Sequence, residues 1–173
     1  KRLLVNIPPG HSKTTNGTVF STVYEIVRDP NSQTAIMSAG EDLAKDIVGQ
    51  IARFLDDPEI YDGAEGNLID EAGPFTDGSN TWTQKALVVC GRQSMEKDPT
   101  VRGFGIDSKI YGRRLHRIIC DDIADEDNMK TAQQRENIKT WLGQTFTTRM
   151  HPRKGRAIMI CTRWSEEDPA AWA

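Results

Sequence analysis

The chain has 173 residues, a formal net charge of −3 and three cysteines, and it begins with lysine rather than methionine. The length allows one domain with a sizeable core, the near-neutral charge gives no overall case for a nucleic-acid binder, and an odd number of cysteines without a CxxC pair argues against a disulfide framework or a zinc knuckle. No stretch approaches the roughly 18 apolar residues of a membrane span and no secretion signal is visible, so we expect a soluble, intracellular protein with no membrane partner.

Apolar runs and helical patterns alternate in the first part of the chain. The run RLLVNI meets two prolines, which indicates a buried strand that ends in a loop. After this loop we expect a helix over residues 13–28, a second buried strand in TAIMSAG, and a second helix over residues 41–55. This order predicts parallel strands joined by crossovers, with helices covering both faces of the sheet.

The rest of the chain is less regular. Residues 56–80 are rich in Gly, Asp, Asn and Pro and look like an exposed insertion. TWTQKALVVCG predicts one or two antiparallel strands, and VRGFGID predicts a glycine-punctuated loop. The chain then returns to core elements, which are strands in LHRIIC and RAIMIC with a polar helix from about Asn128 to Gly143 between them.

The stretch IPPGHSKTT, residues 7–15, has several features of a phosphate-binding loop. Backbone N–H groups at a helix N-terminus can face an anion, and a lysine can reach terminal phosphates. However, Ser12 stands where a glycine usually precedes the lysine, so a turn that merely contains a lysine is the alternative. The nucleotide-binding candidates are Pro9, Gly10, His11, Ser12, Lys13, Thr14 and Thr15.

Two carboxylates follow the apolar strand in LHRIICDDI. Asp121 is a candidate for holding Mg²⁺ together with the hydroxyl of Thr14, and Asp122 for orienting and deprotonating an attacking water. The alternative is an acidic turn after a strand. A third strand ends in Thr162 and Arg163. Because ligands of open parallel sheets bind beyond the carboxyl ends of the strands, we expect these groups to share one site, with a nucleoside triphosphate and Mg²⁺ as its ligands.

Four segments together carry a resemblance to a known family. PPGHSKT has a Pro-Pro pair and a His before the lysine, and SAGEDLAKDIVGQI follows the second strand. VRGFGID leads to the acidic strand RIICDDI. In IMICTRWSEEDPAAW, a strand ends in Thr and Arg, and a Trp and several acidic residues follow. In these features the chain resembles the large terminase subunit of tailed double-stranded DNA phages, the ATPase that packages DNA.

The resemblance implies an α/β fold, a P-loop NTPase-like three-layer sandwich with a mostly parallel central sheet. Residues 1–173 would be a fragment forming the ATPase (motor) domain. An adenine-contacting segment before it and a nuclease domain after it are expected outside this chain, so we predict no nuclease activity here. The implied site residues are Lys13 and Asp122 for catalysis, Thr14 and Asp121 for Mg²⁺, and Thr162 and Arg163 for coupling hydrolysis to motion.

One departure from the family concerns an arginine. Gly10 stands where many relatives have an arginine that could stabilise transition-state charge. An arginine finger is worth roughly 10³ to 10⁵ in rate, so its absence implies a substitute. We expect either Arg102 in cis or an arginine from a neighbouring subunit of a ring.

The resemblance also implies partners and a location. These are double-stranded DNA, a portal protein, a small terminase subunit and further copies of the chain in a ring, at the procapsid portal in the cytoplasm of a bacterial host. The basic run RMHPRKGR could contact DNA phosphates, but a surface turn explains it equally well. A helicase-type ATPase and a non-catalytic module that binds nucleotide or DNA for assembly are the alternative functions.

Overall fold

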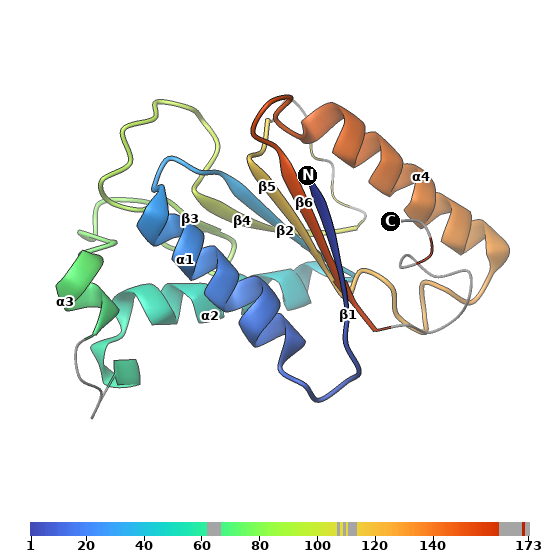
Figure 1. Ribbon diagram of the computed structural model, residues 1–173, viewed down its shortest axis with the longest axis horizontal. Coiled ribbons are helices and arrows are strands. Elements are labelled where there is room, and N and C mark those ends of the chain that lie inside the picture. The colour runs from blue at the N-terminus through green and yellow to red at the C-terminus, as the bar shows by residue number, and fades with distance from the viewer. Residues whose placement is uncertain (62–66, 107, 109, 111–113, 163–170, 172–173) are drawn as a thin grey trace.

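A six-stranded sheet forms the centre of the molecule (Figure 1). The computed structural model describes residues 1–61, 67–106, 108, 110, 114–162 and 171. The strand order is β1-β6-β5-β2-β4-β3, and every neighbouring pair is parallel except β3 with β4. The strands are β1 (Arg2–Asn6), β2 (Thr34–Ser38), β3 (Ala86–Leu87), β4 (Val101–Gly105), β5 (Arg117–Asp121) and β6 (Arg156–Cys161). The predicted mostly parallel α/β sheet is confirmed.

Helices cover both faces of this sheet (Figure 1). The helices are the π-helix η1 (Thr14–Phe20), which runs directly into α1 (Ser21–Arg28), then α2 (Glu41–Asp56), the short η2 (Pro58–Tyr61), α3 (Leu68–Ala72) and α4 (Ala132–Arg149). η1, α1 and α2 pack on one face, and α4 packs on the other. Among the described residues, no helix combines the length and the apolar character that a bilayer crossing requires.

The central strand β2 shows how the sheet divides two cores. All five of its residues are buried. Ile36 packs into the cluster with α1 and α2, whereas Ala35 and Met37 pack into the cluster with α4. Successive side chains of a strand point to opposite faces, so a continuous apolar run is what a strand covered on both sides needs. The expected buried strands in TAIMSAG, LHRIIC and RAIMIC are confirmed by β2, β5 and β6.

The predicted helices are present, with one shift of boundaries. The helices expected over residues 13–28 and 41–55 are confirmed. The helix expected from about Asn128 to Gly143 instead runs from Ala132 to Arg149. Its start is set by Thr131, whose hydroxyl accepts a hydrogen bond from the backbone N–H of Gln134, while the Gln134 side chain accepts one from the N–H of Thr131. This capping box satisfies two N–H groups at the helix start.

Three expectations about the chain are wrong. VRGFGID does not form a loop, because its first five residues are the strand β4. Its glycines allow the backbone of β4 to lie close to α2, because a Cβ at Gly105 would lie only 2.9 Å from the backbone nitrogen of Glu41. RLLVNI is a strand but not a buried one, since β1 lies at the sheet edge and Leu3 is 56% exposed. Residues 56–80 are not wholly exposed, because Phe75 is buried against the α2 side of the core.

Candidate functional site

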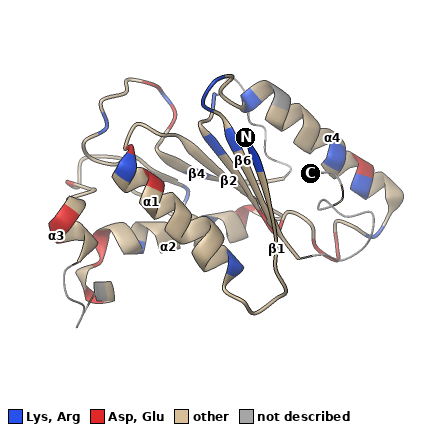
Figure 2. Ribbon diagram, viewed as in Figure 1, with Lys and Arg blue, Asp and Glu red and all other residues tan. Residues whose placement is uncertain are grey.

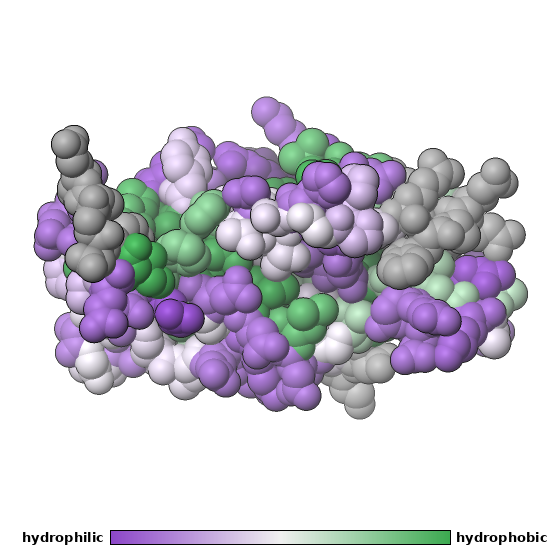
Figure 3. Space-filling model, turned by 90° about the horizontal axis from the view of Figure 1, so that it is seen from below, coloured by the Kyte–Doolittle hydropathy of each residue, from purple (hydrophilic) through white to green (hydrophobic). Residues whose placement is uncertain are grey.

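Three adjacent strands bring polar residues to one edge of the sheet. β6 lies between β1 and β5, and all three run in the same direction. Asp121 is the last residue of β5 and Cys161 is the last residue of β6, so Asp122 and Thr162 come directly after the ends of two neighbouring strands. The loop after β1 returns to the same place through Lys13. Seen from below the view of Figure 1, hydrophilic side chains surround hydrophobic patches on the described part of the surface (Figure 3).

Lys13 joins the three strand ends. Its Nζ lies 2.8 Å from Oδ2 and 2.9 Å from Oδ1 of Asp122, and it also donates a hydrogen bond to Oγ1 of Thr162. The Lys13 side chain is only 11% exposed, whereas that of Asp122 is 35% exposed. Lys13, Asp122 and Thr162, which we expected to share one site, are therefore in direct contact. Arg163, the other residue expected with Thr162, lies outside the described residues.

Asp121 lies beneath this group and is 1% exposed. Its Oδ1 accepts a hydrogen bond of 3.2 Å from Oγ1 of Thr14, and its Oδ2 accepts one from Oγ1 of Thr18. Burial raises the pKa of Asp121, an effect that the Thr18 hydrogen bond opposes and the charge of Asp122 reinforces. Sequence reasoning missed Thr18. Its spacing of four from Thr14, one turn along the helix, is the signal that identifies it.

Backbone conformation turns the two aspartates in different directions. Asp122 has φ of 45°, in the left-handed region that Asp adopts more readily than most residues. Two hydrogen bonds hold it there, from its N–H to the carbonyl of Ile160 (3.0 Å) and from the N–H of Ala39 to its carbonyl (3.3 Å). Asp121 keeps the strand conformation and points to the face covered by η1. Adjacent residues thus present one buried carboxylate and one directed toward Lys13.

The loop between β1 and η1 leads into a helix start that faces this cluster. Ser12 has φ of 51° and Gly10 has φ of 79°, so the serine adopts the conformation usually left to glycine. His11 is exposed, and its Nδ1 lies 3.0 Å from the carbonyl oxygen of Pro9. Lys13 is helical and provides no side-chain cap. The first N–H groups of a helix lack intrahelical partners, so those after Lys13 are suited to an anion.

The helix start also sits unusually close to the sheet. A Cβ at Gly17 would lie 2.7 Å from Cδ1 of Ile160, so the missing side chain lets η1 approach β6. Residues 14–20 form a π-helix, a conformation that often occurs at functional sites. Thr15, the last of the predicted nucleotide-binding residues, is half-buried in this first turn. The loop and the first helical turn therefore have a defined position over the strand ends.

The oxygen atoms around Asp121 fit a magnesium ion. Two ligands in adjacent positions of the Mg²⁺ octahedron lie about 3 Å apart, which is close to the 3.2 Å between Thr14 Oγ1 and Asp121 Oδ1. Ser38 stands next to Asp121 in the sheet, because Met37 pairs with Cys120. Its hydroxyl is buried and has no hydrogen-bond partner among the described residues. That orphaned hydroxyl, which sequence reasoning also missed, can serve a metal-bound water.

This oxygen set is a partial one. In the described part of the chain, no group of three or more His, Cys, Asp or Glu side chains is arranged to hold a metal ion. A site with one carboxylate and one hydroxyl suits Mg²⁺, which usually keeps several waters and binds substrate phosphates, and it does not suit a metal that needs an all-protein cage.

Arg102 is not among the residues that meet here. It lies on β4, two strands from β5, and pairs with Ala35 at the level of Ile118. Standard strand spacings put its Cα about 14 Å from that of Asp121. Its guanidinium instead lies over the ring of Phe104, 5.2 Å from the centroid. A role for Arg102 at the site in cis is not supported by this position.

Neither a protein-family model nor a curated protein sequence matches the chain. The function is therefore inferred from the geometry of Lys13, Asp121, Asp122 and Thr162 and from the sequence motifs that contain them.

Proposed function

We propose that the chain is a P-loop NTPase-like ATPase domain that hydrolyses ATP with Mg²⁺. The observation that carries the proposal is the contact of Lys13 with Asp122 and Thr162 above a buried Asp121 that two threonine hydroxyls hold. A lysine at a helix start and carboxylates on a neighbouring strand end are the parts that phosphoryl transfer requires. Their position beyond the carboxyl ends of parallel strands is where open α/β sheets bind ligands.

Each residue would have a separate task. The N–H groups after Lys13 and its ammonium would hold the β- and γ-phosphates, and Asp122 would orient and deprotonate the attacking water. Thr14 and Asp121 would hold Mg²⁺, which when bound neutralises charge on the phosphate oxygens. Burial favours the neutral form of Asp121. A divalent cation beside it would have the opposite effect and favour the ionised carboxylate.

The ion pair between Lys13 and Asp122 concerns two residues with different proposed tasks. The lysine pairs with the carboxylate that would act as the base. Phosphates would compete for the ammonium, and Asp122 would then be free to accept a hydrogen bond from water. Since Lys13 also contacts Thr162, the same change would alter the end of β6. This contact supports a role for Thr162, and for Arg163 after it, in coupling hydrolysis to motion.

At the level of the whole protein, we propose that this domain belongs to the motor that packages viral DNA. The support is the resemblance of PPGHSKT, RIICDDI and IMICTRW to the large terminase subunit. Double-stranded DNA, a portal protein and a small terminase subunit would be its partners, in the cytoplasm of a bacterial host at the procapsid portal. A ring of copies would supply the arginine that Gly10 does not provide.

The test is Mg-ATP binding and phosphate release by the chain and two variants. We expect Lys13→Ala to abolish binding and Asp122→Asn to abolish turnover while ATP binds about three- to tenfold more tightly, because the lysine loses its ion-pair partner. Lys139→Ala and Glu126→Gln, at exposed positions on and before α4, are the matched controls and should behave as the parent.

Two results would decide against hydrolysis. If the parent binds ATP but releases no phosphate, and Asp122→Asn changes nothing, the chain is a nucleotide-binding assembly module. If neither the parent nor the controls bind ATP, the proposal fails for this chain. Far-UV circular dichroism of each variant separates loss of binding from loss of fold.

A further inference from the structure

A basic hollow lies at the opposite edge of the sheet from the candidate ATP site. Its volume is about 850 Å³, and it lies between the amino ends of β5 and β6 and the C-terminal end of α1. The ribbon is coloured for Lys and Arg at several positions at this edge, around the start of β6 (Figure 2). Two acidic residues, Glu25 and Asp29, line the hollow together with six basic ones: Lys1, Arg28, Arg117, Arg153, Lys154 and Arg156.

Arg117 supplies a buried positive charge. It is 4% exposed, and its Nη1 and Nη2 donate hydrogen bonds of 2.9 and 3.1 Å to the carbonyl oxygen and the hydroxyl of Ser21, both neutral acceptors. Within the described part of the chain, no carboxylate lies at ion-pair distance from its guanidinium. Burial lowers the pKa of Arg117, an effect that the charge of Glu25 opposes and that of Arg156 reinforces. A buried cation of this kind is stabilised when an anion lies beside it.

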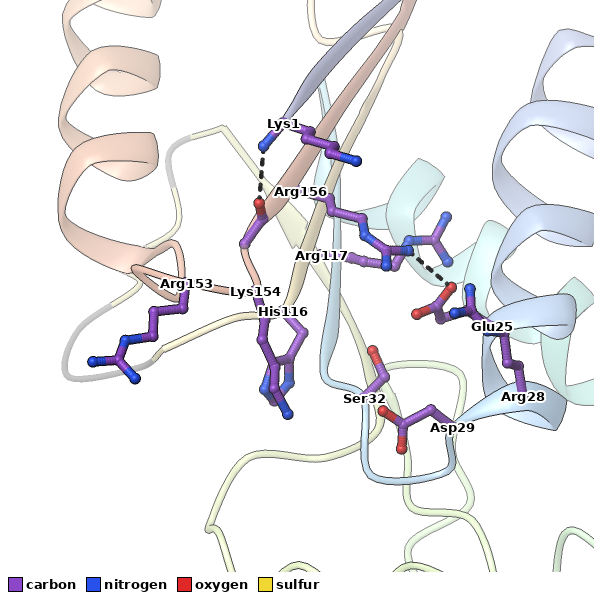
Figure 4. A pocket seen from close by; sticks show the side chains of 11 residues that line it. Lys1, Glu25, Arg28, Asp29, Ser32, His116, Arg117, Arg153, Lys154 and Arg156 are labelled. Atoms are coloured by element: carbon purple, nitrogen blue, oxygen red, sulfur yellow. Dashed lines mark hydrogen bonds and ion pairs between the residues drawn. The ribbon is translucent and has the colours of Figure 1, made fainter.

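The carboxylate of Glu25 already has a basic partner. Glu25 lies 3.5 Å from Nη1 of Arg156, and its charge acts on Arg117 as well. One carboxylate thus faces two guanidinium groups, as the close view shows (Figure 4). The basic side chains from α1 and from the turn before β6 add further positive charge around them. The hollow therefore has an excess of donors and positive charge over acceptors.

The turn that carries Arg153 and Lys154 has a defined shape. Nδ1 of His151 accepts hydrogen bonds from the backbone N–H groups of both residues, at 3.2 and 3.1 Å. The ring of His151 stacks on that of His116, with centroids 5.1 Å apart. A Cβ at Gly155 would lie 2.5 Å from the carbonyl oxygen of His151, so only glycine closes the turn. The basic run RMHPRKGR is thus an ordered turn beside the hollow.

We propose that this hollow binds a phosphate-class oxyanion, with Arg117 and Arg156 as its recognition groups. Guanidinium groups match the oxygen geometry of phosphate with paired N–H donors, and an anion placed here would add to the negative charge of Glu25 and Asp29, which the six basic side chains outnumber. This site is separate from the one proposed for ATP and does not depend on it. The oxyanion has two sources to be distinguished: a free phosphate compound, or the phosphodiester backbone of a nucleic acid.

The experiment compares the whole chain with Arg156→Gln by two titrations. Inorganic pyrophosphate is titrated calorimetrically, and a fluorescent 20-base-pair DNA duplex is titrated by anisotropy at several salt concentrations. Arg53→Gln, a 71% exposed arginine on α2, is the matched control. Lys13→Ala removes binding of pyrophosphate at the ATP site. Arg117→Gln is tested too, but Arg156→Gln carries the decision because its 46% exposed side chain can change without disturbing the core.

The proposal predicts that Arg156→Gln weakens pyrophosphate binding at least tenfold, while Arg53→Gln and Lys13→Ala leave the Arg156-dependent binding unchanged. If the backbone of DNA is the source, Arg156→Gln also reduces the slope of log K against log salt by about 0.9 for each phosphate that the variant no longer neutralises. If DNA binding is unchanged, the source is a free phosphate compound. Equal affinities of the parent and Arg156→Gln for both probes, or no binding of either probe by the parent, overturn the proposal.

Discussion

At the scale of single residues, Asp121 and Asp122 show how neighbours in sequence come to differ in chemistry. Asp121 stays in the strand, buried and held by Thr14 and Thr18. Asp122 adopts a left-handed conformation and turns toward Lys13. The two carboxylates therefore do not compete for one cation. One suits a metal ligand and the other a base near solvent.

The raised pKa of Asp121 gives a pH dependence with a definite sign. The folded state holds this proton more strongly than the unfolded chain, whose pKa is about 3.9. The contribution to stability is therefore largest below that value and is lost as pH rises through the higher pKa of the folded state. We expect Asp121→Asn to remove this loss and to raise the Tm of the metal-free protein at pH 8 by about 2–4 °C.

The control for this prediction is Asp46→Asn, an exposed aspartate on α2. Thermal unfolding of the three proteins at pH 4 and pH 8 provides the test. The advantage of Asp121→Asn should grow between the two pH values, and the same difference at both would contradict the assignment to Asp121. Mg-ATP binding should be lost in Asp121→Asn whatever its stability, because the carboxylate ligand is gone.

Thr18 and Thr22 offer a matched pair on consecutive turns of the helix. Both are fully buried, but only Thr18 hydrogen-bonds Asp121, while the hydroxyl of Thr22 has no partner among the described residues. Thr18→Val should destabilise the protein by about 1–2 kcal/mol, because it leaves one carboxylate oxygen without its donor. Thr22→Val should be neutral or stabilising. Denaturant unfolding measures both, and equal effects would show that the Thr18 hydrogen bond has no special value.

At the scale of elements, glycines decide how β4 and α2 pack. A Cβ at Gly103 would lie 3.0 Å from the carbonyl oxygen of Ala44, and one at Gly105 would lie 2.9 Å from the backbone nitrogen of Glu41. Both neighbours are backbone atoms of α2, which cannot move like a side chain. We expect Gly105→Ala to destabilise by about 1–3 kcal/mol.

The comparison for Gly105→Ala is Gly143→Ala on α4, where a Cβ meets nothing within 4 Å. This second change should stabilise by about 0.5–1 kcal/mol, because alanine favours a helix interior. Chemical denaturation of both variants tests the pair. A Gly105→Ala protein as stable as the parent would mean that α2 does not approach β4 as closely as these distances require.

The elements also show what a sequence can predict. β2, β5 and β6 were predictable because each is an apolar run that both faces of the sheet bury. β4 was not, because glycine at a close approach and glycine at a turn look the same in sequence. Of the site, Lys13, Asp121 and Asp122 were predictable from motifs. Thr18 and Ser38 were not, because their roles depend on the neighbours that folding gives them.

At the scale of the whole molecule, the order of strands assembles the site. β6 comes last among the strands in the chain but inserts between β1 and β5. This insertion places Thr162 close enough for the Lys13 ammonium to contact both Thr162 and Asp122. No local pattern predicts such an order, because it arises from contacts between distant parts of the chain. The same strands connect the two proposed sites, since β5 begins at Arg117 and ends at Asp121.

The contacts that described residues make with Lys13, Asp121 and Asp122 include none from an arginine. If another copy supplies one, ATP turnover per chain should rise at least tenfold with protein concentration as the chains associate. Arg102→Gln should leave turnover within about twofold of the parent, given its distance of about 14 Å from Asp121. Steady-state phosphate release over a concentration series measures this. Turnover independent of concentration but abolished in Arg102→Gln would reverse the conclusion.

The position of β1 at the rim of the sheet has one more consequence. Within the described strands it pairs only with β6, so the outer N–H and C=O groups of β1 have no strand partner. Such a margin can accept an extended segment by main-chain hydrogen bonding. β1 leads directly into the loop that contains Ser12 and Lys13. A strand added to β1 would therefore restrict the motion of β1 and of the start of that loop. Binding of a segment at this edge of the sheet would thus affect the position of Lys13.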